Sequence, residues 1–265
     1  DAMKTSNRSD IPPFYAMEVM KAANDREAAG KSVLHMEVGE PGAGPPRKVL
    51  KAAADALGGG NLGYTEALGI PDLRAAIAKH YGDRYGIELP AGRIVVTTGS
   101  SGGVVLSFLA AFDAGERVAL ADPGYPAYRN ILLALGNEPV SIPATAEQRF
   151  QPTPALLDDV DGKLDGLIVA SPSNPAGTVL GPAEMEALVD RCRNGGIRLI
   201  SDEIYHGITY TQPATTALRF TTDAVVINSF SKYFSMTGLY LSFVNAEDIK
   251  QASILSCVVC DKCEE

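Results

Sequence analysis

Short apolar runs alternate with helix-like segments over most of this chain, and this alternation leaves few folds open to it. Most of the runs are continuous, rich in β-branched or other apolar residues, and bounded by polar residues, Gly or Pro. The six runs are Ile94–Thr97, Arg117–Ala121, Pro139–Ile142, Gly166–Ala170, Ile197–Ser201 and Ala224–Asn228. Such runs are typical of strands in a mostly parallel sheet that helices cover on both faces.

A seventh run, Leu239–Val244, follows the sixth too closely for a helical crossover. We therefore expect it to pair antiparallel, or with a distant strand, in a seven-stranded sheet of an α/β fold. Before the sheet, apolar spacing predicts helices from Phe14 to about Ala29, over Pro46–Leu57 and over Ile70–Tyr85. The alternating segment Val33–Val38 predicts one short additional strand.

Composition excludes several kinds of partner. The 265 residues are 46% hydrophobic, which is enough for a sizeable core, and the net charge is −9. Without a stripe of Lys and Arg, nucleic acids and anionic membranes are poor candidates as partners. The sequence shows no membrane-length apolar segment and no signal peptide, so we expect a cytoplasmic protein. Cys257, Cys260 and Cys263 have metal-site spacing but no fourth ligand, and we predict no metal.

Several candidate site residues follow the strands, and the carboxyl ends of parallel strands meet at one crevice. After the first strand, the turn Thr98–Gly103 opens into a helix-like segment. Its small residues leave N–H groups and hydroxyls free at a helix N-terminus, which suits a phosphate. Ordinary helices also begin this way, and the turn lacks the Gly-x-Gly-x-x-Gly spacing of a dinucleotide fold.

Three other strands end in polar or aromatic side chains. Tyr125 lies on a rigid turn, where its ring can stack on a flat cofactor or simply pack. Asn174 is the strongest hydrogen-bonding side chain of a proline-rich loop. Asp202 ends a buried strand and needs a cation such as a protonated pyridine nitrogen, unless it is a satisfied structural carboxylate. We interpret His206 as a neighbour of this site.

Lys232 follows the sixth strand, which places its amine at the same crevice. A lysine that loses its proton by desolvation can attack a carbonyl, which is the chemistry of Schiff-base formation with an aldehyde cofactor. The alternative is a solvated loop lysine. The joint order of phosphate-suited turn, Tyr, Asn, Asp, Tyr and Lys is far less probable by coincidence than any one of them.

These features together resemble the pyridoxal-phosphate-dependent class I and II aminotransferases, which have the aspartate aminotransferase fold (fold type I). The resemblance runs from about Ser9 to Gly238. Its most specific segments are Gly63–Thr65 with Gly69–Arg74, Asp122–Pro126, Ser173–Gly177, Ser201–Tyr205 and Ser229–Lys232. It implies transamination between an L-amino acid and a 2-oxo acid, with pyridoxal 5′-phosphate as cofactor.

The resemblance also implies roles for single residues. Lys232 would hold the cofactor covalently and move a proton to and from the substrate, and Asp202 would keep the pyridine nitrogen protonated. Tyr205 and Asn174 would bind the ring oxygen, and Tyr125 would stack on the ring. The phosphate would be held by Gly99, Ser100, Ser101 and Ser229. Gly39 would line the substrate carboxylate site together with Asn174. Tyr64 would reach the phosphate of a neighbouring subunit, which implies a homodimer.

On this basis we expect residues 1–45 to form an N-terminal arm and part of a small domain. Residues 46–250 would form the cofactor-binding large domain, and residues 251–265 an atypical Cys-rich tail. The small domain is expected to be incomplete, because the family's long C-terminal segment, with its substrate-binding arginine, is missing.

The sequence departs from the family pattern after Gly238. Family members continue there with Trp-Arg-x-Gly, whose arginine pairs with the phosphate, whereas Tyr240 takes that place here. Losing a charge-assisted bond predicts cofactor retention weaker by about 1.5–3 kcal/mol. One hypothesis is that residues 239–265 are not the original continuation. A carbon-sulfur lyase of the same fold and a non-catalytic fragment are the alternatives to an aminotransferase.

Overall fold

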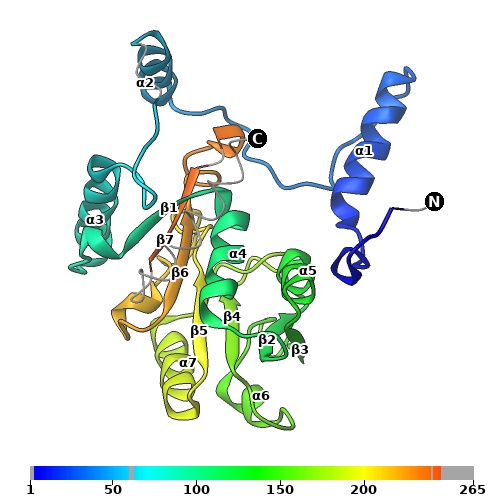
Figure 1. Cartoon of the computed structure of the whole chain (residues 1–265), viewed down its shortest axis with the longest axis vertical. Helices are drawn as coiled ribbons and strands as arrows, with labels where there is room; N and C mark the ends of the chain where they lie inside the picture. Colours follow the sequence, from blue (N-terminus) through cyan, green and yellow to red (C-terminus); the bar gives the residue numbers. More distant parts are fainter. Residues whose placement is uncertain (1–2, 60–62, 240, 246–265) are drawn as a thin grey trace.

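The computed structural model describes residues 3–59, 63–239 and 241–245, and over these residues the strands form one seven-stranded sheet (Figure 1). The strand order is β1-β7-β6-β5-β4-β2-β3. The strands are β1 Ile94–Thr98, β2 Arg117–Asp122, β3 Glu138–Pro143, β4 Gly166–Ala170, β5 Arg198–Asp202, β6 Val225–Ser229 and β7 Leu241–Asn245. The predicted α/β fold is thereby confirmed.

β7 is the one strand of this sheet that runs against the others. It pairs antiparallel with β1, in the register Val95 to Val244, and with β6, in the register Ile227 to Val244. The pairs β6-β5, β5-β4, β4-β2 and β2-β3 are parallel. The expectation that the seventh run pairs antiparallel is confirmed, and it separates β1 from the parallel block.

Seven α-helices accompany the sheet in the described residues. They are α1 Tyr15–Ala28, α2 Arg47–Gly58, α3 Pro71–Tyr85, α4 Gly99–Ala111, α5 Pro126–Leu135, α6 Pro154–Asp158 and α7 Pro182–Gly195. Short 3-10 turns lie at Asn7–Ser9, Ala91–Arg93, Ala217–Arg219 and Thr237–Leu239. None of the described helices combines the length and apolar content that crossing a bilayer requires.

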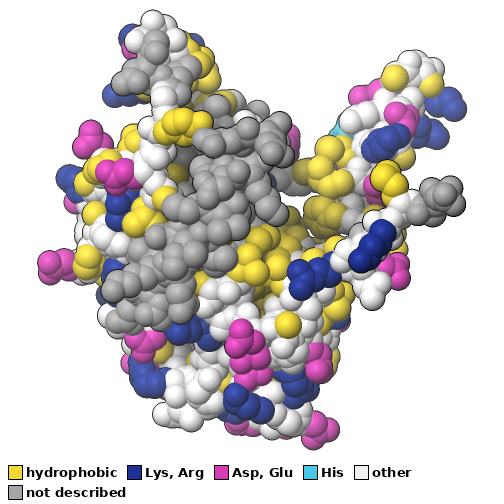
Figure 2. Space-filling model, viewed as in Figure 1, with side chains coloured by type: hydrophobic (Ala, Val, Ile, Leu, Met, Phe, Trp, Pro, Cys, Tyr) yellow, Lys and Arg dark blue, Asp and Glu magenta, His cyan; other side chains and the backbone are white. Residues whose placement is uncertain are grey.

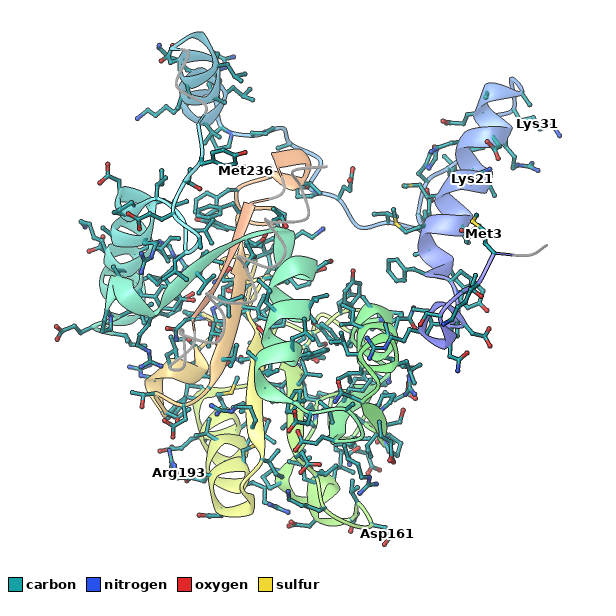
Figure 3. The ribbon with its side chains drawn as sticks, in the orientation of Figure 1. Met3, Lys21, Lys31, Asp161, Arg193 and Met236 are labelled. Carbon is teal, nitrogen blue, oxygen red and sulfur yellow. The ribbon has the colours of Figure 1, made fainter. Side chains whose placement is uncertain are left out.

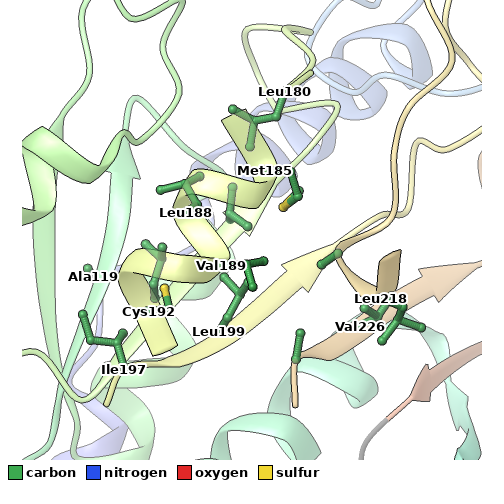
Figure 4. Close-up of a cluster of buried hydrophobic side chains, with 14 of the residues drawn as sticks. Ala119, Leu180, Met185, Leu188, Val189, Cys192, Ile197, Leu199, Leu218 and Val226 are labelled. Atoms are coloured by element: carbon green, nitrogen blue, oxygen red, sulfur yellow. The ribbon is translucent and has the colours of Figure 1, made fainter. Parts of the chain in front are cut away.

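Side-chain alternation along the central strands builds two cores. Ile168 of β4 packs on one face of the sheet, in a cluster with residues of α4 and α5. Leu167 and Val169 of the same strand pack on the other face, with residues of α3, α6 and α7. Figure 4 shows the α7 side of this second core, where Cys192 lies among apolar side chains. Burial raises the pKa of the Cys192 thiol to about 12, as expected for a packed, unreactive cysteine.

Two expectations about local structure were wrong. Residues 33–38 form no strand, because nothing pairs with them and alternate apolar side chains face solvent: Leu34 is 88% exposed and Met36 is 90% exposed. The helix after β1 begins at Gly99 rather than at Val104, so the Gly- and Ser-rich turn forms its first turn. Tertiary packing of this helix overrides the low helix propensity of Gly and Ser.

The N-terminal part of the chain stands apart from the sheet. α1 and α2 extend away from the sheet in Figure 1, joined by residues that form no helix or strand. The described residues therefore do not complete a second domain, in agreement with the predicted incomplete small domain. Tyr240 and the segment 251–265 with its three cysteines lie outside the described residues.

Candidate active site

A cleft of about 860 Å³ opens at the carboxyl end of the parallel strands. Met236, four residues after Lys232, lies toward this end of the sheet, whereas Asp161 and Arg193 lie at the opposite end (Figure 3). Apolar side chains gather in the hollow beside α1 (Figure 2), and residues 12–17 of the N-terminal segment line the cleft on that side. The predicted site residues that line it are Gly39, Gly99, Ser100, Ser101, Tyr125, Asn174, Asp202, Tyr205, Ser229 and Lys232.

Asp202, the last residue of β5, is a buried carboxylate in this cleft. Its side chain accepts hydrogen bonds from the Tyr128 hydroxyl, at 2.5 Å, and from the backbone N–H of Ile204, at 3.0 Å. Burial raises the pKa of Asp202, and these two bonds oppose the rise. Within the described residues, no Lys, Arg or His forms an ion pair with it. A cation bound beside Asp202 would therefore complete its surroundings.

Tyr128 is a site residue that sequence reasoning missed. Tyr125 is the N-cap of α5, and Tyr128 follows it by three positions in the first turn, so both rings lie on one side of the helix, with centroids 5.2 Å apart. The ring of Tyr125 also contacts Phe14 edge-to-face, at 5.7 Å. The Tyr-x-x-Tyr spacing in the sequence indicates that the two side chains share one face of a helix. It does not indicate that Tyr128 bonds to Asp202.

The N-terminus of α4 faces the cleft together with a cluster of serine hydroxyls. Gly99, Ser100 and Ser101 form the first turn of this 13-residue helix. Ser229 accepts a hydrogen bond from the Ser231 N–H, at 3.0 Å, and from the Ser242 hydroxyl, at 2.7 Å. Free N–H groups and hydroxyls at a helix N-terminus favour an anion. Ser231 and Ser242 also line the cleft and were not predicted.

The remaining polar groups face one another across the cleft. Nδ2 of Asn174 donates to the hydroxyl of Tyr205 at 3.3 Å, which joins the loops after β4 and β5. Nζ of Lys232 lies 3.5 Å from the carbonyl oxygen of Gly39, which brings the segment after α1 to the lysine. Tyr64 stands apart from this group: it is 92% exposed and does not line the cleft.

The family model for aminotransferase class I and II matches residues 31–260. The chain belongs to this family. The match confirms the resemblance seen in the sequence, and it extends beyond Gly238. β7, at Leu241–Asn245, lies inside the matched range.

Known aminotransferases resemble this family member closely. The valine–pyruvate aminotransferase of Mycobacterium tuberculosis is 51% identical over 239 residues, covering 89% of this chain and 62% of that protein. The (5-formylfuran-3-yl)methyl phosphate transaminase of Methanocaldococcus jannaschii is 32% identical, and the match covers 89% of this chain and 61% of the transaminase. A crystal structure of an aminotransferase from Mycobacterium tuberculosis superposes with a TM-score of 0.92 at 47% identity, covering 96% of this chain and 67% of that one. The chain thus spans about three-fifths of the length of these curated relatives.

Proposed function

We propose that this chain binds pyridoxal 5′-phosphate through Lys232 and supports transfer of an amino group from an L-amino acid to a 2-oxo acid. The observation that carries the proposal is the buried Asp202 carboxylate, which shares one cleft with the Lys232 amine and has only uncharged hydrogen-bond donors. A pyridine nitrogen that binds a proton is the cation that such a site requires. The residues present therefore fit this cofactor.

The remaining groups of the cleft fit the other parts of the cofactor. Gly99, Ser100 and Ser101 at the α4 N-terminus, with Ser229, suit its phosphate. The Asn174 amide and the Tyr205 hydroxyl are neighbouring donors, and both would suit the ring oxygen. When bound, pyridoxal phosphate supplies an aldehyde that condenses with amines and a ring that withdraws electrons from the substrate Cα. Tyr125, which lines the same cleft, would pack against the flat ring.

Each residue then has a distinct task. With the cofactor bound, Nζ of Lys232 would hold its aldehyde carbon, with release of water, and would be the base for the proton on the substrate Cα once the substrate amine has displaced it. The Asp202 carboxylate would keep a proton on the pyridine nitrogen. The Tyr205 hydroxyl and the Asn174 amide would orient the ring oxygen. Gly39, whose carbonyl faces Lys232, lines the space for the substrate carboxylate.

For the substrates, we propose a small apolar L-amino acid as donor and pyruvate as acceptor. The support is the 51% identity to a valine–pyruvate aminotransferase and the apolar wall that Pro12, Phe14 and Met17 give the cleft. An apolar wall favours an aliphatic side chain over a second carboxylate, which loses its hydration against such a surface.

We also propose that the active unit is a homodimer. The exposed position of Tyr64, outside the cleft of its own chain, suits a residue that acts in the site of a second copy. Sedimentation of the purified chain with and without the cofactor tests this point, and a monomer under both conditions would rule it out.

The reaction is tested by incubating the purified chain with pyridoxal phosphate, valine and pyruvate and following alanine. We expect alanine to form only when both substrates are present. Its formation should be lost in the Lys232→Ala variant. A lyase would instead release ammonia and an oxo acid from an amino acid without any acceptor. If neither reaction occurs at saturating cofactor, the chain is a non-catalytic part of the family fold.

A further inference from the structure

His206 is a buried side chain beside the cleft for which the proposed chemistry has no use. It follows Tyr205 in the turn after β5, its side chain is 2% exposed, and it does not line the cleft. Its ring contacts two distant parts of the chain. One is Tyr85, the last residue of α3, and the other is Ser171, directly after β4.

The contacts of the ring determine where its proton lies. Nε2 of His206 is 3.1 Å from the carbonyl oxygen of Ser171. A carbonyl can only accept, so Nε2 carries the hydrogen. Burial lowers the pKa of His206 to about 4, and the ring is neutral at pH 7. Nδ1 is therefore an acceptor, and the hydroxyl of Tyr85, 2.8 Å away, donates to it.

Glu203 completes the surroundings of the ring. Its Oε1 accepts from the hydroxyls of Ser201 and Thr216 and from the N–H of Ala217, and Oε2 lies 3.6 Å from Nδ1 of His206. Burial raises the pKa of Glu203 to about 8, so this carboxyl is neutral at pH 7 as well. The two side chains are a neutral pair and not an ion pair.

The position of His206 connects it to the site. Ser171 begins the loop that carries Asn174, and His206 directly follows Tyr205. Two side-chain hydrogen bonds therefore join the loop after β4 to the loop after β5. One runs from His206 to Ser171, and the other is the 3.3 Å bond between Asn174 and Tyr205. The backbone N–H of Ser171 also donates to the carbonyl oxygen of Asp202, at 3.2 Å, so the bond from His206 is a second link beside it between the two loops.

We propose that His206 is a positioning residue whose Nε2–H fixes the loop of Asn174 to the loop of Tyr205. This inference rests on the proposed function only for the identity of the ligand that the two loops bind. The role requires a donor at the Nε2 position. Other buried side chains of similar size would fill the space without holding Ser171.

Two variants distinguish the effect of the Nε2–H donor of His206 from the effect of its side-chain volume. His206→Gln keeps an N–H donor near the Nε2 position, whereas His206→Leu keeps a similar size without a donor. We expect His206→Leu to increase amide hydrogen exchange in residues 171–178 and to weaken pyridoxal phosphate binding about tenfold, the effect of one lost hydrogen bond. His206→Gln should keep most of the exchange protection and most of the affinity. Lys79→Gln, at an exposed position of α3, is the control and should change neither.

The outcomes that overturn the proposal are equally specific. If Leu lowers only thermal stability and leaves exchange and affinity unchanged, or if Gln is as impaired as Leu, the donor has no positioning role. Nitrogen-15 NMR of the three histidines adds a direct check, and a proton found on Nδ1 of His206 contradicts the assignment. If the unmodified chain binds no pyridoxal phosphate, the proposed function fails, while exchange and NMR on the cofactor-free chain still decide the role of His206.

Discussion

The hydroxyl of Tyr128 donates a 2.5 Å hydrogen bond to Oδ2 of Asp202, which fixes the carboxylate at the end of β5 from the side of α5. Both residues are buried: Tyr128 is 5% exposed and Asp202 is 4% exposed. A neutral donor stabilises the ionised carboxylate against the desolvation that raises its pKa. Tyr128 thus favours the charge state of Asp202 that holds a cation.

Removing this donor should weaken cofactor binding. Tyr128→Phe is expected to raise the dissociation constant of pyridoxal phosphate about 10- to 100-fold, since a hydrogen bond to a charged group contributes about 1.5–3 kcal/mol. The pKa of Asp202 should rise further, so affinity should begin to fall at a higher pH as the solution is acidified. Absorbance titrations between pH 5 and 8 measure both effects. Tyr81→Phe, buried outside the cleft, is the control; equal affinities for the two variants would refute the role.

The buried carboxyl of Glu203 predicts a loss of stability in mildly alkaline solution. Its pKa is about 8 in the folded chain and near 4.5 unfolded, so the folded state holds an extra proton between these values and stability falls as pH rises. His206, with a pKa lowered to about 4, acts in the opposite direction up to pH 6.5. Between pH 6.5 and 8 the Glu203 effect remains, and it amounts to about 2 kcal/mol.

Urea unfolding of the cofactor-free chain at pH 6.5 and pH 8 measures this loss. Glu203→Gln keeps an acceptor for the three donors at Oε1 but cannot ionise, so its unfolding free energy should change less between the two pH values. Glu186→Gln, on α7, is the matched control and should retain the dependence of the unmodified chain. A Glu203→Gln variant that loses as much stability as the control would disprove the assignment.

Gly207 occupies a position where a side chain does not fit. Its φ is +96°, and an added Cβ would lie 2.4 Å from the ring of Tyr233, the neighbour of Lys232. Gly207→Ala should therefore lower the unfolding free energy by about 1–3 kcal/mol and weaken cofactor binding through displacement of Tyr233. Gly196→Ala is the comparison, because its φ is +62° but the space around it is open. Equal effects of the two substitutions on affinity would show that the contact with Tyr233 is unimportant.

The strands could be predicted from local sequence because buried strands consist of short, continuous apolar runs. β4, Gly166–Ala170, is apolar on both faces and needs no distant information to be recognised. The same signal failed at residues 33–38, where alternation is present but a partner strand is not. The separation of β1 from the parallel block also escaped prediction, since strand order depends on contacts between residues more than a hundred positions apart.

In the site, the sequence indicated the residues at the ends of strands. It did not indicate the residues that hydrogen-bond to them. Asp202 and Lys232 are recognisable because the first ends a buried strand and the second lies three residues after one. Tyr128 was missed and His206 was expected only as a neighbour of the site, because their partners are 74 and 35 positions away and no local spacing identifies such partners. Ser242, whose hydroxyl donates to Ser229, was missed because it lies in β7, whose place in the sheet was uncertain.

The central claim, that Lys232 is the amine that holds pyridoxal phosphate, is tested most directly by borohydride reduction and peptide mass spectrometry. The purified chain is saturated with the cofactor, reduced, digested and mapped, with Lys232→Ala treated in parallel. We expect the added mass on the Lys232 peptide of the unmodified chain, and no equivalent label in the variant. Label spread over exposed lysines such as Lys21 and Lys51, with none at Lys232, would contradict it.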